Sequence, residues 1–210
     1  MTELTLADGE AWQDLATYVG RARRVDPDGA ARLVAEGGVL ATYVSPVHGA
    51  PGPTVIGLRV ARLDGAAGLD VTVPLAALGD RLAGAGAALS VPPQRVTNAG
   101  WAGVSPPRSG WELVTGADPA TLVVAARDGV QEIAQALPEA AGGHVVAQVR
   151  GAVWGRELAG LPGVPAGAAY VADALGFLDA EEAVAVRRRG PWCRLSTSRG
   201  HVLARSGGLL

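Results

Sequence analysis

The sequence contains no lysine, and it has only one cysteine, one methionine and one phenylalanine. Because every basic side chain is arginine, the sequence excludes mechanisms that need a lysine, such as a Schiff base, the P-loop lysine or a Ser-x-x-Lys dyad. The single cysteine, Cys193, excludes an internal disulfide and a cysteine-rich metal site. A basic and apolar leader is also missing from the first residues, so we expect no secretory signal and a cytoplasmic location.

Long hydrophobic runs are scarce as well. The longest stretch without a charged residue, residues 37–58, is long enough in principle to span a bilayer. It contains Pro46, Pro51 and Pro53, which would break a membrane helix, so a strand, a loop and a second strand are expected there. We therefore predict no membrane partner.

The composition that remains is that of a folded protein. Hydrophobic residues make up 49% of the 210 residues, and 18 basic residues nearly balance 20 acidic ones, for a net charge of -2. A chain of this kind buries a sizeable core and is not disordered. Its length suits one large domain or two small ones.

The first half predicts a helix followed by strands. Asp8 is a suitable N-cap for an amphipathic helix that ends near Val25. Strand candidates follow at residues 30–35, 39–44, 54–63 and 69–73, separated by glycine-rich breaks, and a short helix follows Pro74. This spacing predicts a helix packed on a mainly antiparallel meander, in a domain of residues 1–116.

The second half predicts about three helices and a small β-meander, in a domain of residues 117–210. The helices are expected at residues 119–137, 144–154 and 166–178, and short β-type runs at 183–188, 192–197 and 201–205. The fold class is therefore α+β. The order of helices followed by a hairpin also imitates a winged-helix domain.

No catalytic constellation, metal site or cofactor site is predicted. His48, His144 and His201 are far apart in the sequence, without a local ligand pair. Ser105 is followed by Pro106, which lacks the N–H that a nucleophile elbow uses for its oxyanion hole. Cys193 belongs to an apolar strand pattern and is expected to be buried and inert.

Residues 101–111 (WAGVSPPRSGW) form an irregular segment with two tryptophans, a proline pair and one arginine. Aromatic rings bind ligands by stacking, and a guanidinium binds anions with two parallel hydrogen bonds. The candidate ligand-binding or partner-binding residues are Trp101, Ser105, Arg108 and Trp111. The structural alternative is an inter-domain strap whose tryptophans fill the core.

Residues 183–210 contain six arginines and no acidic residue, a local charge of +6 in a chain of net charge -2. A β-hairpin carrying such residues can contact the phosphates of a nucleic acid. The candidate nucleic-acid-binding residues are Arg187, Arg188, Arg189, Arg194 and Arg199. Against this, the helix expected at 166–178 has no Arg, Asn or Gln to contact a base. The structural alternative is a solvated basic edge that discourages strand pairing between molecules.

Several segments together resemble an uncharacterised family of actinobacterial proteins built from domains of unknown function. They are residues 24–33 (RVDPDGAARL), 54–59, 69–78 (LDVTVPLAAL), 101–111, 163–178 (GVPAGAAYVADALGFL) and 192–205 (WCRLSTSRGHVLAR). The resemblance covers nearly the whole chain. It implies cytoplasmic residence and a two-part architecture, and it carries over no activity, cofactor or catalytic residue.

Three hypotheses follow for the function. The leading one is a soluble, non-catalytic binding protein whose partner is a protein or a small molecule, with residues 101–111 and the arginine-rich segment as its surface. The second is a nucleic-acid-binding protein that uses the C-terminal β-meander. The third is a small-molecule enzyme with a site at the domain junction formed by Ser105, Arg108 and His201.

Overall fold

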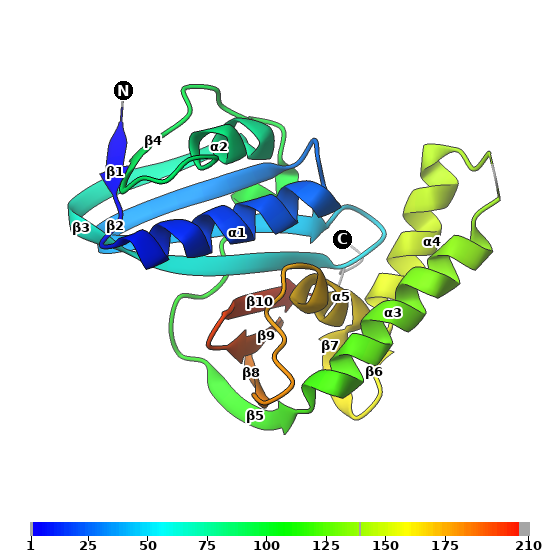
Figure 1. The fold of residues 1–210 in the computed structure, drawn as a ribbon. Helices are drawn as coiled ribbons and strands as arrows, with labels where there is room; N and C mark the ends of the chain where they lie inside the picture. Colours follow the sequence, from blue (N-terminus) through cyan, green and yellow to red (C-terminus); the bar gives the residue numbers. More distant parts are fainter. Residues whose placement is uncertain (1, 139, 206–210) are drawn as a thin grey trace. The chain divides into compact units, whose positions relative to one another are not determined.

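A computed structural model describes residues 2–138 and 140–205 of the chain (Figure 1). The chain divides into two compact units. Unit 1 comprises Met1–Pro46 and Leu58–Gly103, and unit 2 comprises Val47–Gly57 and Val104–Leu210.

Unit 1 is built around a long hairpin and a helix that crosses it (Figure 1). Its elements are β1 (Glu3–Thr5), α1 (Gly9–Val25), β2 (Ala30–Val47), β3 (Thr54–Pro74), α2 (Leu75–Arg81), β4 (Ala88–Ser90) and the 3-10 helix η1 (Gly100–Gly103). The predicted helix start is confirmed, because the Asp8 carboxylate accepts a hydrogen bond from the Ala11 N–H at 2.8 Å. The hydroxyl of Tyr18 on α1 donates to the Thr42 carbonyl of β2 at 3.3 Å.

The predicted four-strand meander in this half is wrong. The first two strand candidates are parts of β2, and the last two are parts of β3. The glycines that separate them include Gly37 and Gly65, which have φ values of +57° and +98°. Because glycine adopts left-handed backbone angles without steric cost, each strand bends at these positions and continues.

Unit 2 combines three helices with a sheet. Its elements are β5 (Glu112–Ala117), α3 (Pro119–Ala136), α4 (Gly143–Gly155), β6 (Glu157–Leu158), β7 (Leu161–Pro165), α5 (Ala166–Ala174), β8 (Val184–Arg189), β9 (Trp192–Thr197) and β10 (Gly200–Arg205). The three helices and three C-terminal strands were predicted near these positions. Helix α5 ends before the predicted residue 178, because Gly176 adopts φ +69° and its N–H donates to the Asp173 carbonyl.

The C-terminal strands lie inside a sheet and do not form the wing of a winged-helix domain. The antiparallel order of the strands is β10-β9-β8-β5. The neighbour of β10 on its other side is β3, and residues 54–57 of that strand belong to this unit. A wing is an isolated hairpin, whereas β8 and β10 here each pair with a further strand. The mixture of helices and antiparallel strands confirms the α+β class.

The core of unit 2 lies between the helices and one face of this sheet. The buried side chains of the strands on that face are Val184, Val186, Cys193, Leu195, Val202 and Ala204. Trp154 of α4 stacks on Tyr170 of α5, with ring centroids 4.5 Å apart, and it fits against Gly129 of α3. Trp154 and Trp192 of this unit are buried, and so is Trp12 of unit 1.

Within residues 2–138 and 140–205, no helix is long and apolar enough to cross a bilayer.

Candidate functional site

Two arginines from neighbouring strands lie directly opposite each other in unit 2. The antiparallel register of β8 and β9 pairs Arg187 with Arg194, and that of β9 and β10 pairs Arg194 with Leu203. Residues that are directly opposite in a sheet point to the same face, and so do residues two positions apart in one strand. The register therefore sorts the arginines of the three strands by face.

One face of β8, β9 and β10 carries four arginines, and we call it the arginine face. Its polar members are Arg187, Arg189, Arg194, Arg205, Ser196 and His201, and the same register places the buried side chains of Trp192 and Leu203 among them. It is opposite to the face packed on the helical core. By the same register Leu113 of β5, which is 63% exposed, lies on the arginine face next to Arg187. The face thus combines four arginines with one exposed leucine on β5, whereas its other large apolar side chains, Trp192 and Leu203, are buried.

The segment before β5 contacts this face. The guanidinium carbon of Arg194 lies 5.7 Å from the centre of the Trp111 ring, within the range of a cation–π interaction. The Trp111 Nε1–H donates to the Pro107 carbonyl at 3.1 Å, and Arg189 donates to the Ser109 carbonyl. Residues 107–111 and the arginine-rich strands therefore form one surface.

Arg194 is held in place by its neighbours. Its Nε–H donates to the Ser196 hydroxyl at 2.9 Å, and its Nη2 lies 3.0 Å from His201 Nε2. Burial, and secondly the charge of Arg187, lower the pKa of the Arg194 guanidinium. An arginine nevertheless stays protonated in proteins, so two cations face each other across the strands.

No acid balances these two charges in the described part of the chain. Among residues 2–138 and 140–205, no carboxylate lies within ion-pair distance of Arg187 or Arg194. Like charges directly opposite in a sheet are destabilising. A bound anion between them would remove this cost, and the arrangement is therefore chemically suited to anion binding.

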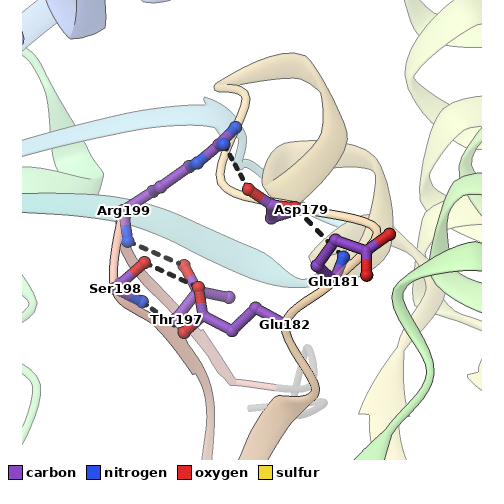
Figure 2. Close-up of polar contacts among 6 residues, drawn as sticks. All are labelled: Asp179, Glu181, Glu182, Thr197, Ser198 and Arg199. Atoms are coloured by element: carbon purple, nitrogen blue, oxygen red, sulfur yellow. Dashed lines mark hydrogen bonds and ion pairs between the residues drawn. The ribbon is translucent and has the colours of Figure 1, made fainter.

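The other two predicted arginines lie elsewhere. Arg188 points to the opposite face, against β7, where a Cβ placed on Gly163 would meet its guanidinium. Arg199, in the β9–β10 turn, forms an ion pair with Asp179 (Figure 2). Successive side chains of a strand point to opposite faces, so the sequence alone predicts that Arg188 lies on the face opposite to Arg187 and Arg189. No local sequence pattern predicts the ion pair of Arg199.

The β9–β10 turn is tied to the segment after α5 by a polar cluster (Figure 2). The Glu182 carboxylate accepts hydrogen bonds from the Ser198 N–H and hydroxyl, both at 2.6 Å. The Glu181 N–H donates to the Asp179 carboxylate at 3.0 Å. Adjacent Glu181 and Glu182 thus take part in different contacts, and the cluster has a structural role.

The residues proposed from segment 101–111 fall into both units. Trp101 lies in η1 of unit 1 and is only 5% exposed, so it fills a core. Ser105, Arg108 and Trp111 belong to unit 2. Ser105 and Arg108 are exposed, and Trp111 is partly buried.

Cys193 and His144 lie outside the arginine face, and His201 on that face contacts Arg194. Cys193 is on the core face, and burial raises the pKa of its thiol to about 11, so it is not a nucleophile at neutral pH. His144 lies 3.0 Å from Gln148 on α4, and His201 contacts Arg194. Within the described residues, no group of three or more His, Cys, Asp and Glu side chains could hold a metal ion.

Two open hollows lie away from the arginine face. One, of about 440 Å³ in unit 1, is lined by Trp12, Gln13 and Thr17 together with residues 84–86. The other, of about 260 Å³ in unit 2, lies between α3 and α5 beside Tyr170. Neither contains a residue of the predicted sites.

Solved structures that resemble this fold are bacterial DNA polymerase sliding clamps, not winged-helix proteins. A Pseudomonas aeruginosa sliding clamp and Caulobacter crescentus pol III beta each have a TM-score of 0.52 at 13% identity. A Bartonella birtlesii sliding clamp bound to griselimycin has a TM-score of 0.50 at 14% identity. Each alignment covers 100% of this chain and 66% of the clamp. The chain thus shares a fold with part of these proteins.

Two domains of unknown function cover the chain. Residues 1–103 match the model of the domain of unknown function DUF8010, and residues 106–209 match that of DUF8185. The matches confirm that the protein is built from domains of unknown function. A comparison with curated protein sequences finds no match.

Proposed function

We propose that this chain is a non-catalytic binding protein that binds nucleic acid on the arginine face of unit 2. The observation that carries the proposal is the pair Arg187 and Arg194, directly opposite in the sheet and unbalanced by any described carboxylate. Phosphate groups spaced along a backbone are the ligands that such a row of guanidinium groups binds best.

The charge distribution supports a nucleic acid. The net charge of the chain is -2, while residues 183–210 carry six arginines and no acid. A local positive field on a nearly neutral protein attracts a polyanion to one surface and leaves the rest unattractive to it. The proteins that share the fold are named a DNA polymerase sliding clamp and pol III beta, which agrees with this ligand class.

The test is a fluorescence-anisotropy titration with labelled single-stranded and duplex DNA at low and moderate salt. We expect binding that weakens with salt, and a log–log slope that falls by about one for each phosphate contact removed. Arg187→Gln combined with Arg194→Gln should weaken binding at least tenfold, which corresponds to about 1.4 kcal/mol.

Arg199→Gln is the matched control, because it removes one charge from the same segment but outside the arginine face. It should reduce affinity by less than the Arg187→Gln variant alone. Absence of binding to either DNA at low salt, or an equal loss in the control, would contradict the proposal. A protein partner bound by the same face would then be the interpretation to pursue.

A further inference from the structure

We infer that the nucleic acid bound by the arginine face is single-stranded, with a base stacked on Trp111 and its phosphates on Arg187 and Arg194. This inference rests on the function proposed above and names its ligand class. The relevant observation is that the cations on this face adjoin a fixed aromatic ring and an exposed leucine.

The Trp111 ring is set in a defined orientation before any ligand binds. Its Nε1–H donates to the Pro107 carbonyl at 3.1 Å, and Arg194 contacts the ring as a cation–π partner. Arg194 is itself oriented by Ser196. A side chain that is already ordered loses little conformational entropy on binding, so its contacts contribute more to affinity.

The chain on either side of the Trp111 ring is exposed, and the tryptophan itself is partly buried. The three residues before it, Arg108 to Gly110, are exposed, and so is Glu112 after it. Leu113, two positions further on, is 63% exposed on the same face as Arg187. The ring therefore lies at the edge of a surface with apolar and cationic positions side by side.

Duplex and single-stranded nucleic acids expose different chemical groups, and this difference favours the single strand as the ligand. In a duplex the bases stack on each other and the outer surface is sugar and phosphate, so Arg187 and Arg194 would find partners but Trp111 and Leu113 would not. A single strand exposes the faces of its bases, and stacking on an aromatic side chain contributes about 1–3 kcal/mol per base. Only a single strand uses the whole surface.

The experiment compares labelled oligothymidylate of about 20 nucleotides with a duplex of the same length, for the full chain and for Trp111→Leu and Trp111→Phe. We expect tighter binding of the single strand. Trp111→Leu should weaken it about tenfold or more, and Trp111→Phe should restore most of the affinity because it keeps an aromatic face. The duplex affinity should change less than about twofold in both variants, since that ligand makes only phosphate contacts.

A second readout checks that stacking involves Trp111 itself. Oligothymidylate should quench part of the tryptophan emission of the wild-type chain, and this part should be missing in Trp111→Phe, which leaves the other four tryptophans in place. Circular dichroism of each variant verifies that it is folded.

The outcomes separate this inference from the proposed function. Equal affinity for both ligands, or an equal loss for both in Trp111→Leu, would overturn the single-strand inference while salt-dependent binding through Arg187 and Arg194 still stands. Absence of binding to both ligands would overturn the proposed function together with this inference.

Discussion

Arg187 of β8 and Arg194 of β9 are direct cross-strand neighbours, and no described carboxylate lies within ion-pair distance of either. Cross-strand like charges lower the stability of a sheet, and an anion bound between them would remove this cost. The flanking contacts, from Ser196 and Trp111 to Arg194, hold the guanidinium in place. This relationship is the basis of the anion-binding site that we propose.

Arg187→Thr should stabilise the free protein while it weakens nucleic-acid binding. Threonine is favoured in strands, and the substitution removes the repulsion of Arg194, so we expect a gain of about 0.2–1 kcal/mol in the free energy of unfolding. The gain should shrink at high salt because salt screens the repulsion. Urea unfolding at two salt concentrations measures it, and a stability loss at low salt would contradict the interpretation.

Gly129→Ala should destabilise unit 2, because a Cβ at this position of α3 would lie 2.4 Å from the Trp154 ring. Overpacking of a well-filled core costs about 1–3 kcal/mol. Gly20→Ala on α1 is the matched control, since nothing lies within 4 Å of its Cβ position. The control should gain about 0.5–1 kcal/mol from helix propensity. Thermal unfolding should show a lower midpoint temperature for Gly129→Ala and a higher one for Gly20→Ala than for the wild-type chain.

Stability should fall in alkaline solution through Cys193. Burial raises the pKa of this thiol from 9.0 to about 11 in the folded state, so between these values the unfolded thiol loses its proton while the folded one keeps it. The contribution is complete below pH 9 and is lost as the pH rises toward 11. Cys193→Ala should flatten this part of the curve of unfolding free energy against pH. Equal slopes for wild type and variant would refute the assignment.

Glu182→Ala should loosen the β9–β10 turn without affecting nucleic-acid binding. The substitution removes both hydrogen bonds from Ser198, and charge-assisted bonds at an exposed site contribute about 1 kcal/mol together. Ser198→Ala removes only the hydroxyl bond and should cost less. Hydrogen exchange of the turn amides reports the loosening, and a parallel loss of DNA affinity would place the turn within the binding surface.

The local sequence predicted most of the secondary structure of unit 2. The Asp118 carboxylate accepts from the Ala120 N–H at the start of α3, as its position before Pro119 indicates. Strand alternation predicted β8, β9 and β10. The meander in the first half failed because a glycine-rich break looks the same in sequence whether the strand ends or bends, as at Gly37 and Gly65.

The sequence by itself determined which residue types are available: arginine as the sole basic residue, a lone cysteine, and the gathering of arginines after residue 183. Only the tertiary structure decided which of them act together. The sheet register places Arg187 opposite Arg194, and Arg188 on the other face. The path of residues 104–111 brings Trp111 into contact with Arg194, whereas Trp101 lies in the core of unit 1. Pairing between strands that are distant in sequence depends on hydrogen bonds and packing across the whole sheet, and local pattern does not encode it.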